Sequence, residues 1–278
     1  MTSTRTLDVL GHPVRLLEGG DGPAVLLLHG SGPGTTGSGA WGATVEALGT
    51  SWRLVAPDHA GFGGSALPPG SRGGLQVWTD RAAGLMDALG VGSFAVVGHS
   101  MGGAVALALA ASLPDRVTQV VAVSTLGAPG APLSDDLDAL WAARPGVDGA
   151  RDMLERLLLD RSLVTPDAVD ARARAMVDGA SAFDTLFPPP RQRWVDDLTL
   201  SEEALAAVRA PVLLVHGADD GVTPLATAAL PLLGLLHDVR LHVLGRCGHV
   251  PSVEHPGEFR RVVSSFLHHA RAPRTDAT

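Results

Sequence analysis

The chain has 278 residues, of which 45% are hydrophobic, and it carries a formal net charge of −8. This length suits one large domain or one domain with an insertion. The negative charge and the absence of a basic cluster argue against a nucleic-acid partner, and a single cysteine excludes a disulfide within the chain. The apolar stretches have the length of strands or buried helices, so we expect no membrane span and no membrane partner.

The first predicted strand covers residues 24–28 and is followed by the loop His29-Gly30-Ser31-Gly32-Pro33-Gly34. A glycine-rich loop at the end of a strand can direct a backbone N–H into a site. Another predicted strand covers residues 52–58, where apolar and β-branched residues again form a short run.

Residues 98–102 read Gly-His-Ser-Met-Gly, the G-x-S-x-G pattern, with Ser100 at its centre. Residues 94–97 predict a buried strand before it, and residues 103–113 predict a buried helix after it. In this context the pattern presents a nucleophilic serine on a sharp turn, with its hydroxyl exposed at the end of the sheet. The N–H of Met101, and that of Ser31 in the earlier loop, are the expected donors of an oxyanion hole.

The next predicted strand covers residues 117–123, and then the pattern changes. Between residues 129 and 201 the sequence predicts no strand, only helices over 134–143, 148–159 and 166–178. Ser134 and Asp148 suit N-caps, and Pro166 suits a first helical turn. A helical insertion between two sheet strands predicts a cap that covers the active site and excludes water.

Two further predicted strands, residues 211–217 and 240–244, precede candidates for an acid and a base. A serine nucleophile needs a base that is oriented by a third group, and the chain order of serine, acid and histidine fits this fold. Either Asp219 or Asp220 is the expected acid. Of 11 histidines, His249 is the expected base because it lies on the loop after the last strand. No metal-ligand spacing occurs, so we expect neither a metal nor a cofactor.

Alternating strands and helices predict an α/β fold with a mainly parallel, twisted sheet flanked by helices. The site should then gather at the carboxyl ends of the strands. The expected organisation is a first core segment, a helical cap, a second core segment and a flexible tail, with the bounds 1–128, 129–201, 202–270 and 271–278.

The sharp turn that carries Ser100, called the elbow below, together with the acid, the base and the cap, resembles the α/β-hydrolase superfamily over nearly the whole chain. Four stretches resemble the meta-cleavage-product hydrolases, which cleave a carbon–carbon bond in 2-hydroxy-6-oxo-dienoates from aromatic ring cleavage: residues 29–34, 160–172, 217–224 and 240–255. The resemblance implies Ser100 as nucleophile, Asp220 as acid and His249 as base. It also implies four substrate-binding positions: Gly32, His99, Arg172 and Val250. Of these, Arg172 is expected to hold the dienoate end of the substrate through its guanidinium group.

At two positions the sequence departs from that family, which usually has asparagine where His99 stands and tryptophan where Val250 stands. The leading prediction is a cofactor-independent serine hydrolase of aromatic-compound catabolism that cleaves a 2-hydroxy-6-oxo-dienoate-like substrate, a vinylogous 1,5-diketone. Gly-His-Ser-Met-Gly is also common among esterases, so an ester, lactone or thioester hydrolase of a biosynthetic pathway remains the alternative. A hydrolase-like ligand receptor is the third. We expect a small-molecule substrate, a cytoplasmic location and compatibility with a homodimer.

Overall fold

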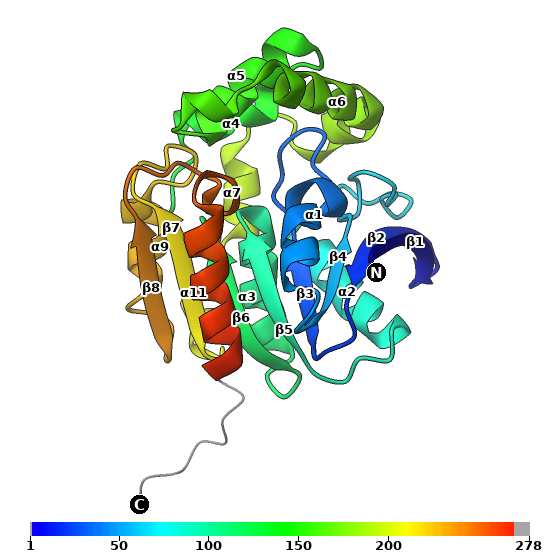
Figure 1. The fold of residues 1–278 in the computed structure, drawn as a ribbon, viewed down its shortest axis with the longest axis vertical. Helices are drawn as coiled ribbons and strands as arrows, with labels where there is room; N and C mark the ends of the chain where they lie inside the picture. The colour runs from blue at the N-terminus through cyan, green and yellow to red at the C-terminus, as the bar shows by residue number, and fades with distance from the viewer. Residues whose placement is uncertain (1, 270–278) are drawn as a thin grey trace, which may run out of the picture.

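The computed structural model describes residues 2–269, apart from the side chains of residues 180–182, 184 and 269. The predicted tail, residues 271–278, and residue 270 lie outside the described residues. Within the described part, eight strands form one sheet in the order β1-β2-β4-β3-β5-β6-β7-β8 (Figure 1). Their bounds are β1 Thr2–Val9, β2 His12–Gly19, β3 Ala24–Leu28, β4 Arg53–Pro57, β5 Phe94–His99, β6 Val117–Val123, β7 Val212–Gly217 and β8 Val239–Leu244.

The six strands β4-β3-β5-β6-β7-β8 are parallel to one another. Strand β2 is antiparallel to both β1 and β4. Alternate residues of the central strands enter separate hydrophobic clusters on the two faces: in β5, Val96 belongs to one cluster and Val97 to the other. A strand that is buried on both faces reads as a continuous apolar run. This is why the six predicted strands are confirmed to within one or two residues.

Helices cover both faces of the sheet. One face packs against α1 and α11, whose Trp41 and Phe259 stack 6.4 Å apart. The other face packs against α2, α3 and α9 (Figure 1). The helix bounds are α1 Gly37–Leu48, α2 Leu75–Ala88, α3 Met101–Ser112, α4 Asp135–Ala142, α5 Val147–Leu157, η1 Arg161–Leu163, α6 Pro166–Leu186, α7 Gln192–Leu198, α8 Glu202–Ala206, α9 Leu225–Leu232, α10 Pro251–Glu254 and α11 Pro256–His269.

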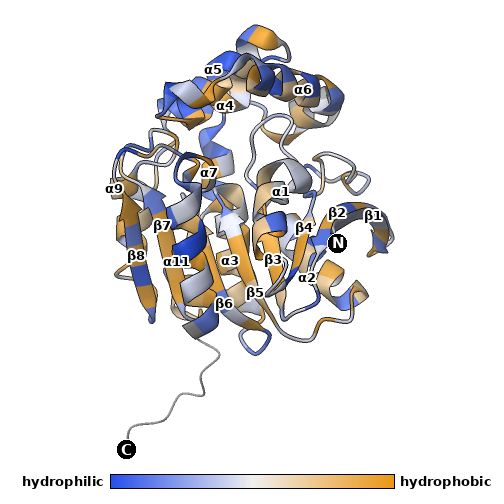
Figure 2. Cartoon of the chain, in the orientation of Figure 1, coloured by the Kyte–Doolittle hydropathy of each residue, from blue (hydrophilic) through white to orange (hydrophobic). Residues whose placement is uncertain are grey.

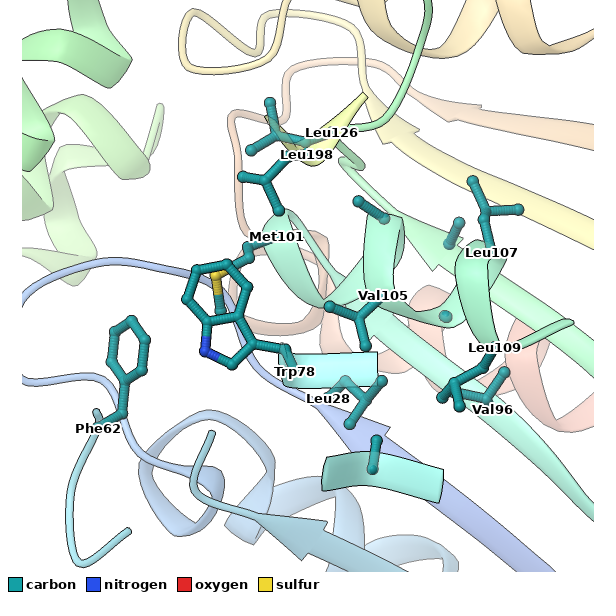
Figure 3. Close-up of a cluster of buried hydrophobic side chains, with 14 of the residues drawn as sticks. Leu28, Phe62, Trp78, Val96, Met101, Val105, Leu107, Leu109, Leu126 and Leu198 are labelled. Atoms are coloured by element: carbon teal, nitrogen blue, oxygen red, sulfur yellow. The ribbon is translucent and has the colours of Figure 1, made fainter. Parts of the chain in front are cut away.

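The elbow helix α3 is the most deeply buried helix of the core. Its side chains pack against strands β3 and β5 and against Trp78 of α2 (Figure 3). The central strands are mostly hydrophobic along their length, whereas α5 and α6 alternate apolar and polar residues (Figure 2). A helix that is apolar on all sides needs burial on all sides. The packing of α3 therefore also fixes the position of Ser100, which directly precedes its first residue.

The segment between β6 and β7 forms the helices α4, α5, η1 and α6, followed by α7 and α8. Helices α4, α5 and α6 lie together above the carboxyl ends of the strands (Figure 1). Ser134 and Thr165 cap α4 and α6 with their side chains, as expected for these residues. Helix α6 continues to Leu186, eight residues beyond its predicted end.

The predicted N-cap at Asp148 is wrong. Helix α5 begins one residue earlier, at Val147, after Gly146 with a φ of 131°, and no side chain caps it. A glycine adopts this torsion without the steric cost that a residue with a side chain would have at this position. Asp148 instead lies in the first turn, where a carboxylate still interacts favourably with the helix dipole.

Candidate active site

Ser100 occupies the sharp turn between β5 and α3. Its φ of 56° and ψ of −117° are strained for a residue with a side chain. A side chain at Gly98 would overlap the Gly102 carbonyl, and one at Gly102 would overlap the Leu28 carbonyl, so both glycines are required for the turn to fit. Ser100 lies at the carboxyl end of β5, as expected, but it is buried rather than exposed: its exposed fraction is 3%, and it lines a cavity.

Asp220 and His249 form a buried pair on the loops after β7 and β8. His249 Nδ1 lies 2.9 Å from Asp220 Oδ2. Because a carboxylate only accepts, Nδ1 carries the proton and the lone pair of Nε2 is available. His249 lines the same cavity as Ser100.

Three other groups orient the Asp220 carboxylate. The backbone amides of Val222 and Thr223 donate to Oδ1 at 2.9 Å each, and the Thr223 hydroxyl donates to Oδ2 at 2.8 Å. Burial by itself raises the pKa of Asp220, but the His249 imidazole and these hydrogen bonds outweigh it and hold that pKa below its usual range. Asp220 is therefore a fixed anion beside His249, whereas Asp219 is exposed.

The cavity has about 750 Å³ of space between its lining atoms, including the solvent at its mouth. Its base is formed by the loop after β3 together with Ser100 and His249, and its roof comes from helices α4, α5 and α6. The roof and wall are mainly apolar and are formed by Leu137, Leu140, Met153, Leu157, Val222 and Val250. Such a site suits an organic substrate with a few polar groups.

The loop after β3 presents Ser31 to this cavity. The ring of His29 fixes the start of the loop: its Nδ1 donates to the Gly30 carbonyl at 2.7 Å, and its Nε2 accepts from the His59 amide at 2.9 Å. Met101, the first residue of α3, buries its side chain in the core (Figure 3). Its amide lies at the N-terminus of this helix, directly after Ser100. Within residues 2–269, neither the Ser31 nor the Met101 amide donates to a backbone carbonyl.

Arg172 reaches the cavity from α6. Its Nη1 donates to the Pro33 carbonyl at 3.2 Å and to Thr35 Oγ1 at 3.3 Å. Burial lowers the pKa of this guanidinium from its usual value, and no carboxylate among the described side chains is paired with it. The neighbouring Arg174 is exposed on the same helix.

The other predicted substrate-binding positions also line the cavity. His99 Nε2 donates to the His249 carbonyl at 2.9 Å, which leaves Nδ1 as an acceptor. Burial, together with the nearby His249, lowers the pKa of His99 to about 3, so its ring is neutral. Gly32 lies against Met153, whose Cε would collide with a side chain there. Val250 is half-buried at the wall.

Two residues near the site were not predicted. The Thr223 hydroxyl, which donates its one proton to Asp220 Oδ2, also lies 3.0 Å from the Ser124 carbonyl. Trp141 of α4 donates to Ser31 Oγ. No motif contains Trp141, and its partner is 110 residues away in the sequence, so only the folded chain reveals the contact.

The described residues set two further limits. No cluster of histidine, cysteine and acidic side chains among them could hold a metal ion. Every helix within residues 2–269 is too short or too polar to cross a lipid bilayer.

A serine on a strand–turn–helix elbow, with a buried Asp–His pair beside it, defines the site type of α/β-fold serine hydrolases. Residues 25–262 match the model of the alpha/beta hydrolase family, and the chain belongs to this family.

Similar proteins include a 2-hydroxymuconate semialdehyde hydrolase from Pseudomonas sp. (strain CF600), 37% identical over 96% of this chain and 95% of its own. A 2-hydroxy-6-oxo-2,4-heptadienoate hydrolase from Pseudomonas putida is 39% identical over 92% of this chain and 93% of its own. Among solved structures, a mutant of the meta-cleavage product hydrolase CumD from Pseudomonas fluorescens IP01, complexed with acetates, superposes with a TM-score of 0.92. It is 34% identical, and the match covers 96% of this chain and 98% of CumD. The chain is accordingly a serine hydrolase enzyme of the α/β fold.

Proposed function

We propose that Ser100, His249 and Asp220 are the nucleophile, the general base and the orienting acid. Asp220 holds His249 in the tautomer with the proton on Nδ1, and Nε2 then takes the proton of the Ser100 hydroxyl as the hydroxyl attacks a carbonyl carbon. The amides of Ser31 and Met101 stabilise the oxyanion that forms, because both are free of backbone acceptors in the described chain.

The segment 129–201 serves as a cap between the core segments 1–128 and 202–270. Several hydrogen bonds tie it to the catalytic loops. The Leu157 carbonyl accepts from the His249 amide at 2.8 Å, and the Val222 carbonyl accepts from Ser134 Oγ at 2.7 Å. Glu254 accepts from the amides of both Leu159 and Asp160. A cap held in this way encloses the substrate and excludes water from the reacting carbonyl.

The substrate is a 2-hydroxy-6-oxo-dienoate-like molecule, and the reaction is hydrolysis of its C5–C6 bond. The observation that carries this proposal is Arg172, a guanidinium without a carboxylate partner in the described chain, in the same cavity as the triad. Arg172 binds the C1 carboxylate of the substrate, and the apolar roof receives the group attached to C6. The names of the similar proteins support the same substrate class.

The reaction proceeds in two halves. The dienol first becomes the 2,6-dioxo tautomer by moving the O2 proton to C5, a shift that His249 assists. Ser100 then adds to the C6 carbonyl and gives its proton to His249. The C5–C6 bond breaks, its electron pair moves through the conjugated chain to O2, and O2 takes the proton from His249. The 2-hydroxydienoate product leaves, and the C6 acyl group stays on Ser100. Water activated by His249 hydrolyses this ester, releases a carboxylic acid and restores the serine.

A second candidate, hydrolysis of an ester, lactone or thioester, is favoured by His99 and Val250. Neither offers the donor that asparagine or tryptophan would supply at these positions. The deciding experiment follows the loss of the coloured dienolate of 2-hydroxy-6-oxo-6-phenylhexa-2,4-dienoate and identifies benzoate as the product. Turnover of p-nitrophenyl esters without dienolate loss would support the second candidate, and tight binding without turnover of either would support a receptor.

The cytoplasmic location and the homodimer belong to the same proposal. A small organic acid from aromatic catabolism is generated inside the cell, where a cytoplasmic enzyme can act on it directly. Analytical ultracentrifugation of the purified protein tests the dimer, and cell fractionation tests the location.

A further inference from the structure

Trp141 of α4 makes a buried polar contact with the loop after β3. Its indole Nε1 donates a hydrogen bond of 2.8 Å to Ser31 Oγ, and both residues are 3% exposed. The bond joins the cap to the loop that carries a proposed oxyanion donor. Trp141 is not among the described residues that line the cavity, so it acts on the site through Ser31 rather than through the substrate.

The indole is itself fixed by aromatic packing. The ring of Phe187, directly after α6, stacks on Trp141 with a centroid distance of 4.5 Å and an interplanar angle of 4°. Phe187 is buried and also contacts the rings of Phe183 and Trp194. This packing limits the orientations of the indole, so Nε1 is aimed at Ser31 before any substrate binds.

The Gly30–Ser31 peptide unit is held at both ends. His29 Nδ1 donates to the Gly30 carbonyl at 2.7 Å. Since a trans peptide is planar, fixing this carbonyl directs the Ser31 N–H to the opposite side. Trp141 fixes the Ser31 side chain from the cap. Glycines on either side of Ser31 would otherwise leave this part of the loop free to rotate.

We propose that Trp141 is a positioning residue that couples the cap to the oxyanion hole: by holding Ser31 Oγ, it keeps the Ser31 N–H aligned on the oxyanion formed at Ser100. This inference rests on the proposed role of the Ser31 amide. An aligned donor stabilises the transition state without reorganisation. Because the oxyanion is absent from the ground state, loss of alignment lowers kcat and leaves KM nearly unchanged.

The test uses Trp141→Phe, Ser31→Ala and the double variant, with p-nitrophenyl acetate as substrate. Phenylalanine keeps an aromatic ring for the stack on Phe187 but lacks the N–H donor and part of the indole volume. Alanine at position 31 removes the acceptor and keeps the backbone amide. Each single variant should lower kcat about three- to tenfold, the usual effect of one hydrogen bond, with KM changed less than about twofold. The double variant should lose no more than either single one, because both remove the same bond.

A matched control is Trp194→Phe. Trp194 is also a buried cap tryptophan that contacts Phe187, but its Nε1 donates to the Pro188 carbonyl at 2.8 Å and not to the loop after β3. The Trp194→Phe variant should keep wild-type kcat. Inhibition supplies a second readout: Trp141→Phe should weaken phenylboronic acid, which forms a tetrahedral anion on the serine, by the same factor as kcat. Inhibition by benzoate should not change.

A wild-type kcat in Trp141→Phe, additive losses in the double variant, or an equal loss in Trp194→Phe would overturn the proposal. If Trp141→Phe does not fold, Ser31→Ala alone decides, and unchanged kcat and boronate inhibition in it would also overturn the proposal. Ser100→Ala separates this inference from the proposed function. Ester turnover that survives in Ser100→Ala would count against the triad itself, whereas an inactive Ser100→Ala beside an unaffected Trp141→Phe would reject only the role of Trp141.

Discussion

Two adjacent aspartates follow β7, and their surroundings separate their roles. Asp220 is buried against His249 and accepts hydrogen bonds from the backbone and from Thr223, whereas Asp219 is exposed. Asp220→Asn should lower kcat/KM by about a thousandfold or more, because an amide favours the wrong imidazole tautomer. Asp219→Asn is the matched control and should remain near wild type in ester and dienoate assays. A larger loss in Asp219→Asn would reverse the assignment.

His99 precedes Ser100 in the sequence, and its ring lies 4.6 Å from that of His249, but it should not control the pH dependence of the reaction. Its pKa of about 3, lowered by burial and by His249, keeps the ring neutral throughout the range from about pH 5 to 9. His99→Asn should therefore leave the pH of half-maximal kcat/KM unchanged, even if the plateau value changes. A shift of that midpoint by about half a unit or more would show that His99 titrates during catalysis.

At the level of single residues, the sequence predicts those that belong to a motif with known mechanics. Ser100 is identified by its glycines, and His249 by its place after the last strand. The choice between Asp219 and Asp220 needs the direction of each side chain, which only the resemblance to a family supplied. Trp141 could not be predicted, because its role depends on a contact between distant elements.

Helix α6 brings Arg172 into the cavity that Ser100 also lines, and the effect of this residue should depend on the substrate. Arg172→Ala should reduce kcat/KM on 2-hydroxy-6-oxo-6-phenylhexa-2,4-dienoate about tenfold to a hundredfold, the range for a hydrogen bond to a charged group. Hydrolysis of p-nitrophenyl acetate should change little, because the ester has no carboxylate. Arg174→Ala, on the exposed side of the same helix, serves as the control. Equal losses on both substrates would assign Arg172 to holding the loop at Pro33 rather than to substrate binding.

Prediction of elements succeeded where burial leaves a clear pattern. The central strands are apolar because both faces are covered. The hairpin of β1 and β2 lies outside the predicted strands, since β1 is largely exposed and its sequence is polar. The extension of α6 to Leu186 was missed, although Phe183 and Leu186 in this part of the helix belong to the hydrophobic core.

The molecule as a whole should lose stability as the pH falls below neutral. Burial lowers the pKa of four histidines, namely His29, His59, His99 and His216. Each therefore takes up its proton at a lower pH in the folded state than in the unfolded state, where protonation begins near pH 6.5. The unfolded state then binds more protons, so the free energy of unfolding decreases with falling pH, by up to about 1.4 kcal/mol per pH unit for each group.

Urea unfolding at pH 7.5, 6.5 and 5.5 checks this expectation. The midpoint should fall steadily below pH 6.5, and Asp220 adds a further loss only in more acidic solution, because its folded pKa is lowered below that of an unfolded aspartate. A midpoint that stays constant between pH 7.5 and 5.5 would mean that the buried histidines take up protons in the folded state.

The central claim is that Ser100 is the nucleophile of a triad enclosed by the cap. Its most direct test is the turnover number of folded Ser100→Ala on both the dienoate and p-nitrophenyl acetate, with circular dichroism and thermal unfolding matched to wild type. We expect kcat to fall by at least about a thousandfold on both substrates, because the triad acts as one unit. Near-wild-type turnover of either substrate by the folded Ser100→Ala protein would contradict the account.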